Sequence, residues 1–102
     1  MRTVIVRYKV KPDRVAENEA LVRAVYEELH RTTPAALRYA TFRLADRVSF
    51  VHIASTEADD GSSPLTGLEA FKRFTANIAD RCDEPPVVTE VEAIGAYRAF
   101  AD

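Results

Sequence analysis

The strongest constraint on the fold is the order in which two hydrophobic periodicities alternate along the chain. Residues 3–10, TVIVRYKV, carry apolar side chains at every second position, which is the pattern of a β-strand with one buried face. Residues 11–31 change to apolar steps of three and four from Val15 to Leu29, which indicates an amphipathic helix. Strand patterns follow at 37–46 and 48–56, then a helical pattern at 66–82 and a strand pattern at 87–100. The predicted order is therefore βαββαβ.

Local signals bound these elements. Pro34 ends the first helix, because the residue before a proline avoids helical backbone angles. Thr66 and Glu69 have the spacing of a capping box, which predicts the start of the second helix. The two prolines at 85–86 are expected to stop that helix, and Gly95 predicts a bulge in the last strand. A hairpin is expected near residues 46–47.

This order predicts an α+β fold in a single domain, residues 1–102. Right-handed crossovers place both helices on one face of an antiparallel sheet, which gives a ferredoxin-like βαββαβ plait. The expected strand order is 4-1-3-2, with the first and third strands in the centre.

The face of the sheet that the helices leave uncovered is predicted to be largely apolar. Its expected apolar members are Ile5, Tyr39, Val51, Ile53 and Val91. A contiguous patch of this kind usually marks an interface, so we expect a homodimer in which two sheets pack face to face about a two-fold axis. Lys9 is expected on this face too. Arg7 and Arg43, also placed there, are expected to pair with Glu90 or Glu92 of the partner.

Composition excludes some classes of protein. The 102 residues contain 14 Lys plus Arg and 16 Asp plus Glu, a net charge of −2, with no basic stripe for nucleic acid. No apolar stretch is long enough for a membrane span. The single cysteine, Cys82, excludes an internal disulfide and suits a reducing cytoplasm, where we expect the protein. Cys82 lies at the end of the second helical pattern, where a reactive thiolate is not expected.

The stretches TVIVRYKVKPD and SFVHIASTE, the spacing of the first helix and the long last strand resemble the dimeric α+β barrel superfamily. Within it, the chain is most similar to antibiotic-biosynthesis-monooxygenase-like domains, over essentially its whole length. The resemblance implies a dimer with a ligand pocket between helices and sheet in each subunit. It also implies activities that range from cofactor-free oxygenases of quinols and polycyclic aromatics to isomerases and haem-degrading enzymes. The chain has no tryptophan, and Phe71 and Phe74 stand where many relatives carry a histidine, which argues against haem degradation.

Three polar residues are the candidates for chemistry. His52 shares strand parity with Phe50 and is expected to face the helices near Tyr8, while Asn18 is the polar member of the inner stripe of the first helix. A neutral imidazole suits general-base catalysis near pH 7, with Asn18 or Tyr8 orienting the ligand. The alternative is a buried histidine whose hydrogen bonds to Asn18, Tyr8 or a backbone carbonyl are purely structural.

The pocket beside His52 is expected to be bounded by Phe50, Phe71 and Phe74. One hypothesis is a cofactor-free oxygenase or isomerase of a small aromatic or quinol ligand. The other is a non-catalytic dimeric ligand-binding or accessory protein whose own phenylalanines fill the pocket. An open cavity beside His52 would favour the first, and a cavity closed by Phe71 and Phe74 the second. No cofactor and no metal ion are expected in either case, since no metal-ligand spacing is present.

Overall fold

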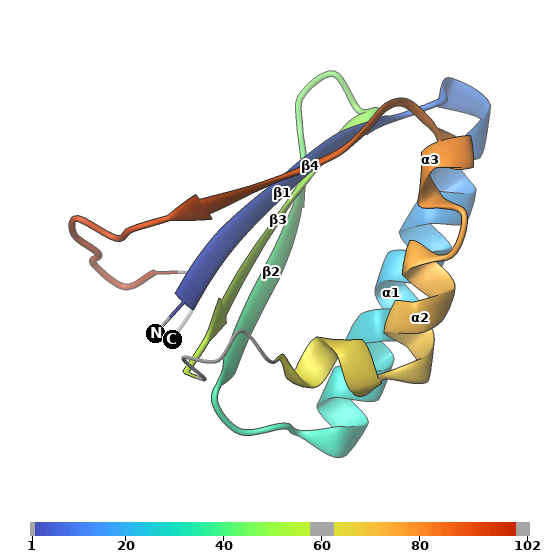
Figure 1. The fold of residues 1–102 in the computed structure, drawn as a ribbon. Coiled ribbons are helices and arrows are strands. Elements are labelled where there is room, and N and C mark those ends of the chain that lie inside the picture. The colour runs from blue at the N-terminus through green and yellow to red at the C-terminus, as the bar shows by residue number, and fades with distance from the viewer. Residues whose placement is uncertain (1, 58–62, 100–102) are drawn as a thin grey trace.

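The protein has a four-stranded antiparallel sheet with the strand order β2–β3–β1–β4 (Figure 1). A computed structural model describes residues 2–57 and 63–99. The strands are β1 Arg2–Val10, β2 Leu37–Arg43, β3 Ser49–Thr56 and β4 Cys82–Val91. The ferredoxin-like α+β fold and the central positions of the first and third strands are as predicted from the sequence.

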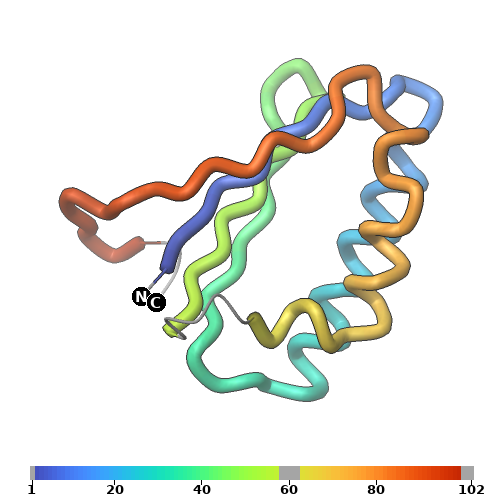
Figure 2. The backbone as a smooth tube through the Cα atoms, viewed as in Figure 1, coloured from blue at the N-terminus to red at the C-terminus, as the bar shows by residue number. Residues whose placement is uncertain are grey.

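All helical segments lie on one face of this sheet, and the other face is left without helices (Figures 1 and 2). The segments are η1 Pro12–Arg14, α1 Val15–Thr32, η2 Pro64–Gly67, α2 Glu69–Thr75 and α3 Ile78–Arg81. The helix α1 ends as expected just before Pro34, where Thr33 takes a left-handed conformation and its backbone N–H donates to Leu29 O. In the part of the chain that the structure describes, no helix is both long and apolar enough to span a membrane.

The second helical pattern forms two helices instead of the single one predicted. Asn77 adopts a left-handed conformation with φ of 56°, which separates α2 from α3. The carbonyl groups that this break frees are bound by Arg81, whose guanidinium donates to Phe74 O at 2.6 Å and to Ala76 O at 3.4 Å. The side chain of Arg81 thus offers hydrogen bonds that a continuous helix would supply from its own backbone.

The predicted capping box is absent. Thr66 lies in η2, where its hydroxyl donates to Ser63 O, and Leu68 is the N-cap of α2 without a side-chain bond. The cap comes instead from a distant residue, because Glu28 Oε1 of α1 accepts the backbone N–H of Ala70 at 2.8 Å. This bond attaches the start of α2 to α1.

The last strand lies earlier in the chain than predicted. Residues 85–86, expected to stop a helix, lie within β4, where an irregularity in the pairing between Arg7–Val87 and Lys9–Glu84 accommodates them. Proline is tolerated there because β4 is an edge strand. Residues 92–99 are not part of a strand, so the bulge expected at Gly95 does not form; residue 100 lies outside the described residues.

The predicted hairpin joins β2 to β3. The carboxylate of Asp46 accepts backbone N–H bonds from Val48 and Ser49 and a bond from the Ser49 hydroxyl. Arg47 is left-handed, with φ of 68°. Asp46 thus stabilises the turn, which lacks the Asn-Gly pair common in tight hairpins.

The register of this hairpin corrects the predicted placement of Tyr39 and Arg43. Thr41 lies directly opposite His52, so Tyr39 and Arg43, which share its parity, face the helices and not the open face. Tyr39 reaches the imidazole of His52, and Arg43 pairs with Glu19 of α1 at 3.2 Å. The open face receives Phe42 instead, with 42% of its surface exposed.

Candidate functional site

His52 lies at the centre of the helix-covered face, with 3% of its surface exposed. Both ring nitrogens lie within hydrogen-bond distance of hydroxyl groups. The Tyr8 oxygen is 2.7 Å from Nε2, and the Tyr39 and Thr41 oxygens are 2.7 Å and 3.0 Å from Nδ1. The antiparallel register produces this arrangement, because β1 and β2 flank β3 and both present side chains of the same parity to the helices.

Burial fixes the charge states in this cluster. Burial lowers the pKa of His52 to about 4, so the imidazole is neutral at pH 7. Burial also raises the pKa of Tyr8 and Tyr39 well above the ordinary phenol value, although a hydrogen bond from Asn18 opposes the shift at Tyr8. The cluster at pH 7 therefore holds two protonated phenols and an uncharged imidazole.

Asn18 extends the cluster into the helix layer. It is fully buried, and its Nδ2 donates to the Tyr8 oxygen at 3.0 Å. On its other side, Asn18 Oδ1 accepts a bond of 3.4 Å from Nε of Arg81. The sequence predicted that His52, Asn18 and Tyr8 would meet, and the structure brings them together.

A cavity of about 380 Å³ lies between the sheet and α2, next to His52. Its wall includes Tyr8, Tyr39, His52, Phe71 and Phe74 together with aliphatic side chains of β1, β3 and β4. Phe71 and Phe74 line this space and leave it open. The volume is within the range of small-molecule sites, which run from roughly 300 to 1,000 Å³.

The cavity has a buried end and an exposed end. Tyr8, His52 and Phe74 are buried, whereas Arg2, Thr66, Thr75 and Val88 of the same wall are exposed. A ligand would therefore enter past these exposed residues and meet His52 and Tyr8 at the buried end.

Two of the expected site residues lie behind the wall and not in it. Phe50 does not line this cavity; it stacks on the Tyr8 ring, with ring centroids 5.6 Å apart, and belongs to the core. Asn18 does not line the cavity either, and it donates a hydrogen bond to Tyr8, which does. Tyr39, which does line the cavity, was missed because its predicted strand parity placed it on the opposite face. The strand register would have revealed the facing of Tyr39, because Thr41, two residues further along β2, pairs with His52.

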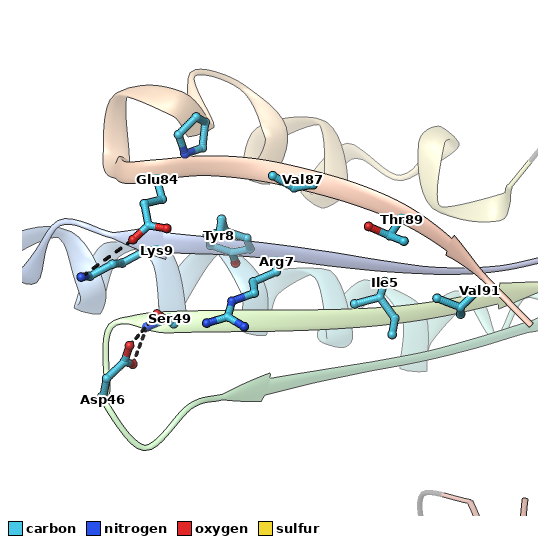
Figure 3. Close-up of a pocket in the computed structure, with 11 residues that line it drawn as sticks. Ile5, Arg7, Tyr8, Lys9, Asp46, Ser49, Glu84, Val87, Thr89 and Val91 are labelled. Carbon is cyan, nitrogen blue, oxygen red and sulfur yellow. Dashed lines mark hydrogen bonds and ion pairs between the residues drawn. The ribbon is translucent and has the colours of Figure 1, made fainter. Parts of the chain in front are cut away.

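A second hollow, of about 640 Å³, lies on the helix-free face, along β1 and β4 (Figure 3). Ile5 and Val91 line one part, and Arg7, Lys9 and Glu84 line the other, with Lys9 and Glu84 3.9 Å apart. It is larger than the first cavity, but His52 does not border it. We therefore place the candidate site on the helix-covered face.

The remaining candidates for chemistry are not assembled into a site. Cys82 is buried at the start of β4, and burial raises the pKa of its thiol, which keeps it protonated at pH 7. His30 is exposed in the last turn of α1. Within residues 2–57 and 63–99, no group of three or more His, Cys, Asp or Glu could hold a metal ion.

Comparison with solved structures identifies the fold. A structure described as an antibiotic biosynthesis monooxygenase superposes with a TM-score of 0.76 at 23% identity, covering 93% of this chain and 100% of that one. A protein from Mycobacterium tuberculosis gives 0.75 at 19% identity, covering 93% and 96%. A protein of unknown function from Nitrosomonas europaea gives 0.72 at 15% identity, covering 94% and 91%. No family model and no curated protein matches the sequence. The chain thus has the fold of antibiotic-biosynthesis-monooxygenase-like structures, as the sequence resemblance implied.

Proposed function

We propose that this protein binds a small aromatic or quinol ligand in the cavity beside His52 and acts on it as a cofactor-free oxygenase or isomerase. One observation carries the proposal: the cavity is open, largely apolar, and ends at a neutral imidazole joined to the phenol of Tyr8. Phe71 and Phe74 supply flat surfaces against which an aromatic ring can pack. His52 is the base, Tyr8 carries the proton to it, and Asn18 holds Tyr8 in place.

The chemistry needs only a dry space and a proton acceptor. Removing a proton from a quinol gives an electron-rich anion that can react with oxygen directly. The same anion can instead take a proton back at a different ring atom, which is an isomerisation. The ligand hydroxyl gives its proton to the Tyr8 oxygen while the Tyr8 proton moves to His52 Nε2, 2.7 Å away. The products are a ligand anion and an imidazolium ion, with Tyr8 unchanged.

The energetics show what the ligand must contribute. The pKa of His52 is about 4, and that of an ordinary phenol is ~10. Transfer of a proton from such a phenol to His52 therefore costs roughly 8 kcal/mol. The attraction between the imidazolium and the new anion in the buried cavity reduces this cost. Catalysis is therefore expected to require an oxygen atom placed against the cluster, and bulky apolar ligands without one should bind without reacting.

A second candidate is the non-catalytic ligand-binding protein. One observation favours it: both nitrogens of His52 already have partners within the chain, as a structural histidine would. In that case the cavity would bind the same class of ligand and release it unchanged.

We also propose that the protein is a homodimer built on the helix-free face. Phe42 and Val87 are exposed there, with Ile5, Val51 and Ile53 between them on adjacent strands. A second copy would remove these groups from water and enclose the hollow of Figure 3. Light scattering is expected to give about twice the chain mass.

The test uses a dihydroxynaphthalene as the probe, with binding measured by thermal shift and reaction by oxygen uptake against the rate without protein. We expect a raised melting temperature, and oxygen uptake that His52→Gln lowers at least tenfold. His30→Gln, the same change at an exposed site, is the control and should leave both unchanged. Binding without any reaction would favour the carrier function, and no binding by a panel of phenols and quinols would contradict the proposal.

A further inference from the structure

The buried guanidinium of Arg81 is the starting point of a hydrogen-bond chain that runs to His52. Arg81 has 2% of its surface exposed and stacks on the ring of Phe74, with its Cζ 5.7 Å from the centroid. Its three nitrogens donate to Asn18 Oδ1, Phe74 O and Ala76 O. An arginine side chain can only donate hydrogen bonds. The hydrogen-bond chain therefore begins at a group whose direction of donation cannot change.

The guanidinium of Arg81 orients the amide of Asn18. Its oxygen must face Arg81, since two donors cannot share a hydrogen bond, so its NH₂ group must face Tyr8. The Tyr8 oxygen consequently accepts from Asn18 at 3.0 Å. The hydroxyl proton of Tyr8 is then left to donate, and His52 Nε2 at 2.7 Å is the acceptor that the described residues offer.

We infer that Arg81 is a positioning residue that acts through Asn18 and Tyr8 to hold His52 as the Nδ1–H tautomer. In this state Nε2 carries the lone pair and faces the Tyr8 proton, while Nδ1–H donates to the oxygen of Tyr39 or Thr41. The opposite tautomer would direct two donors, Asn18 and His52, at the Tyr8 oxygen and leave the Tyr8 proton without an acceptor in the cluster. A buried donor left without an acceptor is disfavoured, so the Nδ1–H tautomer should dominate.

This inference rests on the proposed function only for its meaning in catalysis. If His52 is the base, the tautomer decides which atom accepts the proton: Nε2 receives it through Tyr8, and Nδ1 cannot, because it already carries a hydrogen. The tautomer itself is a property of the unliganded protein. It can be measured whether or not a quinol binds or reacts.

Long-range ¹H–¹⁵N correlation spectra of uniformly ¹⁵N-labelled protein at pH 7 measure the tautomer directly. The chain has two histidines, so the spectrum contains two imidazoles, and exposed His30 serves as an internal reference that averages between tautomers. We expect an unprotonated shift at Nε2 of His52 and a protonated shift at Nδ1. An Nε2–H tautomer, or an even mixture, in the wild type would overturn the inference.

The variant Asn18→Asp should reverse the direction of the hydrogen bonds between residue 18, Tyr8 and His52. A carboxylate only accepts hydrogen bonds, so it would accept from Arg81 and also from the Tyr8 hydroxyl, after which the Tyr8 oxygen can accept from His52 Nε2–H. The unprotonated shift should then move from Nε2 to Nδ1. Asn77→Asp makes the same change outside the cluster and is the matched control. An unchanged tautomer in Asn18→Asp, or an equal change in Asn77→Asp, would overturn the inference.

A second variant tests the donor itself. Arg81→Met removes the guanidinium, so the amide of Asn18 can turn either way and both tautomers should be populated. A pure Nδ1–H tautomer in this variant would show that Arg81 does not set the direction. Asn18→Asp keeps Arg81 and its bonds to α2, so the inference remains testable even if Arg81→Met does not fold. Failure of the quinol experiment alone leaves these spectra, and the inference, intact.

Discussion

The two faces of the sheet are built from alternate residues of the same strands, yet they differ in how completely a single chain buries them. The helix-covered face carries the polar cluster around His52, and no buried side-chain nitrogen or oxygen of the described residues lacks a hydrogen-bond partner. The helix-free face carries Phe42 and Val87, with 42% and 63% of their surfaces exposed. One face is complete within a single chain, and the other has apolar surface that a single chain leaves in water. Their responses to substitution should therefore differ in kind: changes on the first should alter stability, and changes on the second should alter assembly.

The largest expected effect is on assembly, and it follows from placing a charge on the helix-free face. Ile53 lies between Ile5 and Ala40 on the adjacent strands, so Ile53→Asp puts a carboxylate among apolar groups. An unpaired charge buried in an interface costs about 3–5 kcal/mol, which would weaken dimerisation by at least a hundredfold. Light scattering at micromolar concentration should give the mass of one chain.

Val88→Asp is the matched control for this experiment. Val88 is exposed on β4 but faces the helix side, so the same substitution there should leave the proposed dimer intact. Val51 is a poorer target, because Arg7 lies directly opposite and could neutralise a new carboxylate. Equal dissociation by both variants would show that the interface lies elsewhere.

The next effect concerns the stability of the helix-covered face. His52→Leu leaves the buried hydroxyl of Tyr8 and the partly buried hydroxyl of Tyr39 without their imidazole partner, which should lower the free energy of unfolding by about 3 kcal/mol. His52→Gln keeps part of the hydrogen bonding and should cost about 1–2 kcal/mol. Urea unfolding measures both, with His30→Leu as an exposed control expected within about 0.5 kcal/mol of wild type. Two neutral variants would mean that the cluster does not stabilise the fold.

The contrast between the faces also explains what the sequence could predict. Strand and helix periodicity fix the order of elements and the facing of β1 and β3, so the fold and the meeting of His52, Tyr8 and Asn18 followed from pattern alone. The facing of β2 did not, because Tyr39 and Phe42 are both large and aromatic and suit either side. Only the pairing of Thr41 with His52 settles it. Hydropathy alone does not decide such a strand.

The polar partners contributed by distant residues were equally hidden. Arg81 looks like an exposed charge near a helix end, and Glu28 like one member of a surface pair. Both are explained only once the break at Asn77 and the approach of α2 to α1 are known. A hydrogen bond that depends on tertiary placement leaves no local signature, which is why the capping box at Thr66 was predicted and a cap from Glu28 was not.

A smaller effect should appear as a dependence on pH. The pKa of His52 is about 4 in the folded protein against an ordinary value of 6.5, so the unfolded chain takes up a proton that the folded one refuses. Stability is therefore constant above about pH 6.5 and falls as the pH drops towards 4, by about 2 kcal/mol at pH 5. Urea unfolding between pH 7.5 and 5 measures this slope, and His52→Gln should remove it.

Asp46→Asn separates this effect from acid titration of the hairpin. Hydrogen bonds from the side chain and backbone of Ser49 and from the backbone of Val48 lower the pKa of Asp46 to about 2. Its contribution is lost only below about pH 4, so the slope between pH 7.5 and 5 should be the same in Asp46→Asn as in the wild type. A wild-type protein with no slope in this range would mean that His52 titrates normally and is open to water.

The smallest effect tests how the helix layer is held over the cavity. Glu28 Oε1 accepts the backbone N–H of Ala70 at 2.8 Å, which joins α1 to the first turn of α2, the helix that carries Phe71 and Phe74. Glu28→Ala removes this bond and leaves the N–H unpaired, so unfolding should become easier by about 1 kcal/mol, as for loss of a helix cap. Its neighbour Glu27 is exposed, and Glu27→Ala should change stability by less than about 0.5 kcal/mol. Hydrogen exchange adds a local measurement, since the amide of Ala70 should lose protection in Glu28→Ala while the amides of β1 keep theirs. Equal protection of Ala70 in the two variants would show that α2 is held by packing of Phe74 and Leu68 alone, and that the cavity roof does not depend on Glu28.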